Sequence, residues 1–245
     1  QSGTDEYSES YMVTVQWCHY LEFIQEFTNH TFLVRILSNS TPSDAEFMFT
    51  GRYHFPNTSY LLNSSSERYR TIIFEVYEII DDTQLLCDLT EKEGIASAEI
   101  LFDSYTGHWT GDDHLGDDSG YGRLNGCDDG SVDTFERDFE LGFSIDVVDP
   151  DGDAIPRWME EQVYYTDPLS NDAERDDDTD EIPLFWEWKY EFDPFKYEDH
   201  RHTDAENDGI STHEEYLVSQ WNSDPFRKDI FVELDQMEPG PDNNG

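Results

Sequence analysis

Residues 149–160 read DPDGDAIPRWME, residues 176–187 read DDDTDEIPLFWE, and residues 204–215 read DAENDGISTHEE. Each stretch has an acid at positions one, three and five, Ile at position seven and Glu at position twelve. In a loop of this length the acids converge on a hard cation, the seventh residue offers its backbone carbonyl, and the twelfth binds bidentately. The pattern therefore predicts three calcium sites. Their ligands are Asp149, Asp151, Asp153, Ile155 and Glu160; Asp176, Asp178, Asp180, Ile182 and Glu187; and Asp204, Glu206, Asp208, Ile210 and Glu215.

An acid-rich chain can produce such a frame by chance, so the spacing of the copies carries the argument. The copies start 27 residues apart (149 to 176) and then 28 (176 to 204), and an Asp-Pro dipeptide follows each one, at residues 167, 193 and 224. A fixed period, with the same dipeptide after every copy, is typical of a structural repeat. We therefore expect three calcium-binding repeats over residues 149–229. The aromatic-rich segments 158–165, 185–190 and 216–221 are each long enough for a short helix whose apolar side packs on the next repeat.

The order Ile then Pro at positions seven and eight, in Ile155-Pro156 and Ile182-Pro183, resembles thrombospondin type 3 repeats of secreted bacterial and archaeal proteins. The ordinary EF-hand fits less well, because its aliphatic residue stands at position eight. The resemblance implies extracellular, calcium-stabilised structure and no chemistry. At position six a sharp turn favours Gly, which only the third copy has, as Gly209. We expect the third loop to adopt this turn most readily, because other residues rarely take a positive φ.

The charge of the chain excludes one class of partner. Among 245 residues there are 57 acids and 14 Lys plus Arg, a formal net charge of −43. Nucleic acid is excluded as a partner, because phosphate binding needs the opposite charge. The mean hydropathy is −0.76 and no apolar run is long enough to span a bilayer, so we expect no direct membrane insertion. Further calcium sites and adaptation to high salt are two competing explanations for the acidity.

The first part of the chain, residues 1–148, has the pattern of a β-protein. Short runs rich in Val, Ile, Phe and Tyr are separated by Asn, Ser, Asp and Gly, at residues 11–17, 31–37, 46–53, 71–79, 98–102 and 139–147. This spacing predicts an antiparallel β-sandwich, so the expected fold class is mainly β, with a loop-rich, short-helix repeat region after the sandwich.

A long acidic loop is expected at residues 103–133. Loops of this length are usually functional or disordered. Its acids at a sandwich end resemble the calcium-binding loops of the protein kinase C conserved-region-two family, without a diagnostic motif, so a further calcium site and a solvated acidic loop both stay open. The acids concerned are Asp112, Asp113, Asp117, Asp118, Asp128, Asp129 and Asp133, together with Asp81, Asp82 and Asp88.

Several features favour an extracellular or cell-surface location. Residues 29–65 contain four N-glycosylation sequons, at Asn29, Asn39, Asn57 and Asn63. The sequence begins with Gln1, and we expect that a signal peptide or another segment has been removed upstream. Cys18, Cys87 and Cys127 allow one disulfide, joining Cys87 to Cys18 or to Cys127, or three reduced buried thiols.

No catalytic motif stands out. His213-Glu214 lacks the second His of a metalloprotease helix, and there is no Walker loop, nucleophile elbow or dinucleotide fingerprint. His200 and His202 could bind a transition metal or simply flank the third loop. We therefore expect no enzyme.

The expected function is that of a secreted, acidic, calcium-binding structural protein of the cell surface or extracellular matrix. Self-association into filaments or binding to other surface proteins would follow from pairing of the N-terminal strand with an open sheet edge. Residues 230–245 should form a terminal strand and flexible tail. This segment resembles a junction in secreted archaeal proteins that leads into a metallopeptidase-like domain, so a calcium-stabilised spacer of a larger protein is the alternative. Surface adhesion through Tyr105, Trp109 and Tyr121 is a third possibility.

Overall fold

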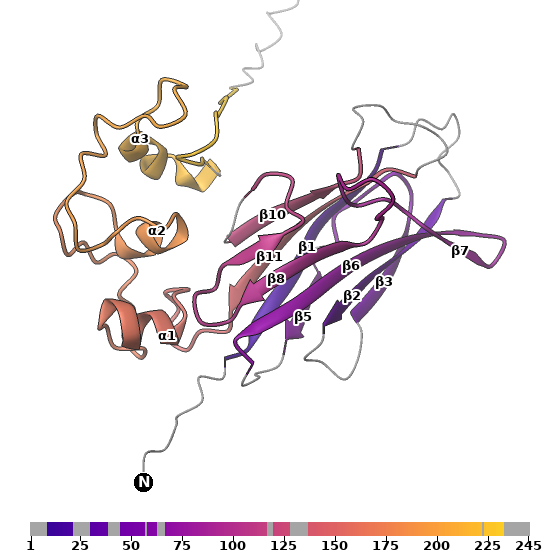
Figure 1. Ribbon diagram of the computed structural model, residues 1–245, viewed down its shortest axis with the longest axis horizontal. Helices are drawn as coiled ribbons and strands as arrows, with labels where there is room; N and C mark the ends of the chain where they lie inside the picture. The colour runs from indigo at the N-terminus through magenta and orange to yellow at the C-terminus, as the bar shows by residue number, and fades with distance from the viewer. Residues whose placement is uncertain are drawn as a thin grey trace, which may run out of the picture.

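The computed structural model describes residues 9–21, 30–38, 45–56, 58–62, 67–116, 120–127, 137–221 and 223–232. Two antiparallel sheets form a β-sandwich, and short helices follow it in the chain (Figure 1). This confirms the predicted fold class, mainly β with few short helices.

The first sheet has the order β10-β11-β1-β4, with β5 also paired to β1. Its strands are β10 (Gly120–Asn125), β11 (Phe139–Val147), β1 (Tyr11–Tyr20), β4 (Tyr53–His54) and β5 (Thr58–Leu62). The second sheet has the order β3-β2-β6-β8-β9, with β7 also paired to β6. Its strands are β3 (Ala45–Thr50), β2 (Thr31–Ser38), β6 (Tyr69–Ile80), β8 (Ala98–Asp103), β9 (Trp109–Gly111) and β7 (Thr83–Leu86).

The alternation of apolar residues decides which face of each strand is buried. Along β6 the side chains of Ile72, Phe74 and Val76 are fully buried, and their neighbours are partly exposed, as the two-residue period of a strand requires. In β1 the register against β11 shifts between Val15 and Trp17. This bulge changes the phase of the alternation, so that Val15 before it and Cys18 after it are both buried.

All six predicted runs overlap observed strands, and four short strands lie outside these runs: β5, β7, β9 and β10. Two of these, β9 and β10, lie inside the predicted loop 103–133, so the prediction of one continuous loop there was wrong. β9 forms because Trp109 is 2% exposed and pairs with Phe102 of β8. The predicted terminal strand is not seen at Ile230, Phe231 and Val232, which are exposed and irregular, and residues 233–245 lie outside the described residues.

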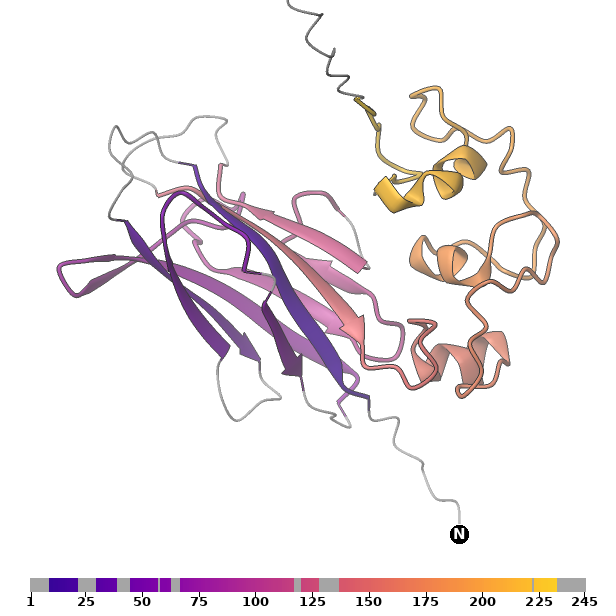
Figure 2. The ribbon, with the colours of Figure 1, turned by 180° about the vertical axis from the view of Figure 1, so that it is seen from behind.

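Each repeat carries one short helix that begins at position nine of its twelve-residue loop. These are α1 (Arg157–Met159), which continues as a π-helical turn (Glu160–Tyr164), α2 (Leu184–Lys189), and α3 (Thr212–Leu217), which is followed by a 3₁₀ turn (Ser219–Trp221). The N-cap residues are Pro156, Pro183 and Ser211, and only Ser211 forms a capping box, with Glu214. The helices follow one another in an arc beside one end of the sandwich (Figures 1 and 2). None of the described helices has the length and apolarity needed to cross a membrane.

Aromatic side chains join the first two repeats to the sandwich. The Trp188 indole nitrogen donates a hydrogen bond of 2.8 Å to the carbonyl of Thr106, and the rings of Trp158 and Tyr105 stack with centroids 5.3 Å apart. Between these contacts Gly107 has φ of +79°, and a Cβ there would lie 2.8 Å from the Trp188 ring. Only glycine permits so close an approach, so the predicted core role of these aromatic residues is supported for the first two repeats.

Of the two alternatives for the cysteines, the disulfide is not formed among Cys18, Cys87 and Cys127, which all lie in the described residues. Cys18 and Cys87 are fully enclosed in the sandwich core, where a thiol packs as a small apolar side chain. Burial also raises the pKa of the Cys18 thiol, which keeps it protonated and unreactive.

Candidate metal centres

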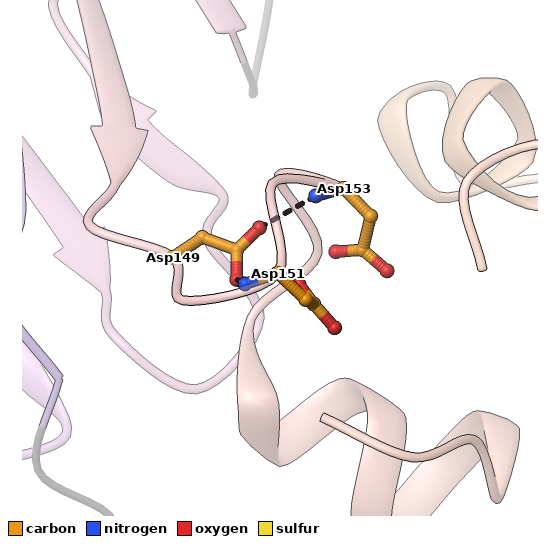
Figure 3. A group of neighbouring side chains, drawn as sticks. All are labelled: Asp149, Asp151 and Asp153. Atoms are coloured by element: carbon orange, nitrogen blue, oxygen red, sulfur yellow. Dashed lines mark hydrogen bonds between the residues drawn. The ribbon is translucent and has the colours of Figure 1, made fainter. Parts of the chain in front are cut away.

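The structure brings the acids at positions one, three and five together in every loop. In each group one ligand atom per residue lies within 4.8 Å of the others. The groups are Asp149, Asp151 and Asp153 (Figure 3); Asp176, Asp178 and Asp180; and Asp204, Glu206 and Asp208. Three carboxylates held this close repel one another, so a positive charge placed among them would stabilise the arrangement.

The acid at position one closes the loop by accepting backbone hydrogen bonds. Figure 3 shows the carboxylate of Asp149 accepting the N–H of Asp153, at 2.7 Å. The residue at position six also donates its N–H to the position-one carboxylate, from Ala154 at 2.8 Å, Glu181 at 3.1 Å and Gly209 at 3.1 Å. Each loop is therefore wound around the carboxylate of its first residue.

The residue at position six takes the same left-handed conformation in all three loops. The φ values are +66° at Ala154, +76° at Glu181 and +97° at Gly209. The third loop was expected to adopt this turn most readily, and the two loops without Gly at position six adopt it as well. The hydrogen bond to position one holds the two non-glycine residues there, at a strain cost on the order of 1 kcal/mol each. Backbone strain of this kind is common at binding sites.

The glutamate at position twelve is buried in every site. Glu160, Glu187 and Glu215 are at most 1% exposed. Both carboxylate oxygens of Glu187 and of Glu215 are buried without a hydrogen-bond partner, and Glu160 accepts one weak bond of 3.4 Å from Thr166. Burial, and then the charges of the acids in the same loop, raises the pKa of each of these three carboxyl groups to about 8.

A carboxylate is rarely buried without a partner, because its desolvation costs several kcal/mol. Glu187 and Glu215 are two such groups, each near the three acids of its own loop, and a bound cation would explain this arrangement. The donor set is oxygen only, from carboxylates and the expected carbonyl at position seven, which suits a hard cation such as Ca²⁺. The Ile at position seven also anchors the loop, because Ile155 and Ile182 are buried. The nine acids that the structure groups could therefore hold a cation of this class, and the position-seven carbonyls and position-twelve glutamates remain predicted ligands.

One contact at the predicted loops was missed by the sequence reasoning. His200 is 2% exposed, and its Nε2 lies 2.9 Å from Oδ2 of Asp180 at position five of the second loop. The sequence analysis related His200 to the third loop or to a transition metal, because only three residues separate it from Asp204, and its carbonyl does accept the N–H of His213 in the third repeat. His202 does not join it, since His202 is exposed and pairs with Asp199.

The described acids of the sandwich loops do not form a fourth group. Asp112 pairs with Lys92 at 2.6 Å. Asp113 accepts hydrogen bonds from the backbone of Leu115 and Arg123, so it organises its own turn. Asp81 and Asp82 are exposed, and Asp88 accepts the N–H of Thr90 at 3.0 Å. The remaining predicted acids and the four sequons lie outside the described residues: Asp117, Asp118, Asp128, Asp129 and Asp133, and Asn29, Asn39, Asn57 and Asn63.

The aromatic residues considered for surface adhesion are engaged within the molecule. Trp109 is buried, Tyr105 stacks on Trp158, and the hydroxyl of Tyr121 accepts a hydrogen bond from Trp17. These three rings therefore do not support an adhesive surface on the sandwich loops.

Comparisons with known proteins give no family assignment. No protein-family model matches the chain, and no curated protein matches it. Among solved structures, a C2 domain of plant extended synaptotagmin 1 is similar over 56% of this chain and 93% of that chain, with 9% identity and a TM-score of 0.33. Human GIVD cytosolic phospholipase A2 is similar over 58% of this chain, with 11% identity and a TM-score of 0.34, but the match spans only 18% of that enzyme. Likeness at this level carries no argument about function.

Proposed function

We propose that this chain is a calcium-binding, non-catalytic structural protein in which each of the three loops holds one Ca²⁺. The observation that supports this most directly is the burial of Glu187 and Glu215 with unpartnered carboxylates, each beside the three acids of its loop. Bound calcium would supply the positive charge that these groups lack.

The structural role follows from where the position-twelve residues lie. Glu187 belongs to α2, between Trp186 and Trp188, which are 2% and 6% exposed. Trp188 packs on the sandwich at Thr106 and His108. Holding Glu187 in place therefore also holds the contact between the repeats and the sandwich. The loops stabilise architecture in this proposal, and no reaction is assigned to them.

We also propose that the protein works outside the cell, as a surface or matrix component that associates with itself. The repeats resemble secreted calcium repeats in sequence, and loops of this kind bind calcium in the millimolar range of extracellular fluids. With a net charge of −43, copies of the chain repel one another strongly, and neutralisation of the loops reduces this repulsion. Sedimentation and electron microscopy in millimolar calcium, repeated after chelation, test the assembly. Compact monomers in both conditions would contradict it.

Direct binding measurements test the calcium sites. Calorimetric titration of the chelator-treated chain should give three calcium ions per chain. The triple variant E160Q/E187Q/E215Q should lose this binding, because it removes the buried ligand of every loop. The matched control E174Q/D177N/D199N removes three exposed carboxylates from the same region and should retain three ions. The proposal fails if the wild-type chain binds no calcium at 10 mM, a concentration about ten times the largest dissociation constant of extracellular calcium modules. It also fails if the control loses binding as the triple variant does.

A further inference from the structure

The Asp-Pro dipeptide after each loop forms the same turn three times. Its Asp side chain accepts the N–H of the residue two positions later, and its carbonyl accepts the N–H three positions later. The side-chain bonds are Asp167 to Leu169 (3.2 Å), Asp193 to Phe195 (3.1 Å) and Asp224 to Phe226 (2.9 Å). The carbonyl bonds come from Ser170 (2.8 Å), Lys196 (3.0 Å) and Arg227 (3.1 Å). Pro at the second position of a turn and Asp at the first favour this geometry.

The chain that leaves this turn comes back to the loop that precedes it. The residue five positions after the Asp donates its backbone N–H to Oδ2 of the position-five acid. These bonds join Asp172 to Asp153 (3.3 Å), Glu198 to Asp180 (3.4 Å) and Asp229 to Asp208 (2.8 Å). In the second loop, where the bond is longest, His200 adds a contact of 2.9 Å to the same oxygen.

The other oxygen of the position-five acid is held from inside the loop. Oδ1 accepts the N–H of the Ile at position seven, at 2.9 Å in the first loop, 3.0 Å in the second and 2.8 Å in the third. Both oxygens of this carboxylate are therefore fixed in every repeat. A carboxylate that lies within 4.8 Å of two others would otherwise rotate away from them to reduce repulsion.

We propose that each Asp-Pro turn is a positioning element of the calcium loop before it. The turn places one backbone N–H on the position-five carboxylate and so orients that ligand toward the cation before the cation binds. This inference rests on the proposed calcium binding of the loops. It explains why the dipeptide recurs after every copy, although Asp167, Asp193 and Asp224 are not in the ligand set. Removal of a group that hydrogen-bonds to a metal ligand typically lowers metal affinity by about 10- to 100-fold.

A consequence is that no loop is complete without the segment that follows it. The first loop needs Asp172, which lies only four residues before the second loop begins. The third loop needs residues 224–229, which lie beyond its own helix. The functional unit is therefore longer than the twelve-residue frame and runs from position one to the residue five positions after the Asp of Asp-Pro.

The second repeat offers the cleanest test, because Asp193 is exposed and its side chain accepts the N–H of Phe195. In Asp193→Ala this bond is lost, and we expect one of the three calcium sites to weaken by about tenfold or more, with the other two unchanged. In Asp193→Asn the amide oxygen still accepts the N–H, so affinity should return to near the wild-type value although the charge is gone. Calorimetric titration of the full chain with calcium gives the affinities.

A double-mutant comparison separates positioning from general destabilisation. In the E187Q background, where the second site is already disabled, D193A should leave the two remaining affinities unchanged. The inference is overturned if D193A binds like the wild type, if D193N binds as weakly as D193A, or if D193A weakens the remaining sites in the E187Q background. Failure of the wild-type chain to bind calcium at all would instead refute the proposed function, so the two failures are distinguishable.

Discussion

Replacement of Glu187 by Gln should have opposite effects on stability with and without calcium. Glu187 is 1% exposed, and its pKa is raised to about 8 from an ordinary value of 4.5. Without calcium at pH 7, the folded chain must either bind a proton at Glu187 or bury its charge. The gap of about 2.5 pH units between 4.5 and 7 corresponds to at most about 3 kcal/mol of lost stability, and solvent screening reduces this to about 1–3 kcal/mol.

Gln has nearly the same shape as Glu and no charge, so E187Q should recover that free energy in the calcium-free chain. For a domain of this size the melting temperature should rise by about 2–12 °C in a chelator. In the presence of calcium the effect of E187Q on stability should be the opposite. A site with calcium at about 10 to 100 times its dissociation constant adds about 1.4–2.7 kcal/mol, and E187Q loses that contribution.

The assay is thermal unfolding, followed by tryptophan fluorescence, of the wild type, E187Q and D177N in chelator and in 10 mM calcium (a concentration on the order of 10–100 times an extracellular-type dissociation constant). Asp177 lies in the same loop but at position two, where it is exposed and pairs with Arg175. D177N therefore removes the same charge without removing a ligand and should follow the wild type in both conditions. A melting temperature of E187Q that is lowered equally in chelator and in calcium would refute the reasoning, because it would make Glu187 an ordinary packing residue.

Four further predictions follow from the same contacts. The calcium-free chain should lose stability as the pH rises from about 4.5 to about 8, because the position-twelve glutamates hold protons more tightly when folded, and a flat pH profile in chelator would contradict this. Calcium affinity should rise over the same pH range, because a protonated glutamate cannot bind the ion. Calorimetric titrations at about pH 6 and about pH 8, on either side of about pH 7, would show this rise. Gly107→Ala should destabilise the chain by about 1–3 kcal/mol and increase exposure of Trp188 to an aqueous fluorescence quencher, since the added Cβ would meet that ring. Phe74→Ala should cost about 3–5 kcal/mol in urea unfolding with or without calcium, because Phe74 is fully buried in the sandwich.

The comparison of sequence and structure is clearest at the loops. The acids at positions one, three and five were predictable because a fixed local spacing brings them to one side of a short turn. The turn at position six was expected from the sequence, but its formation by Ala154 and Glu181 was not, because their positive φ is supported by hydrogen bonds to Asp149 and Asp176. In the sandwich, long alternating strands such as β6 were evident from their period. β9, with three residues, becomes a strand only by pairing with β8.

The sequence alone determined the elements whose cause is local. It specified the mainly β first part through alternation of apolar residues, and it specified three acidic loops through a repeated spacing. Only the tertiary structure decided that Glu187 and Glu215 are buried without partners, that Gly107 receives the ring of Trp188, and that the chain after each Asp-Pro turn returns to its own loop. These facts depend on contacts between residues that are distant in sequence, and a local pattern contains no information about which distant group will cover it.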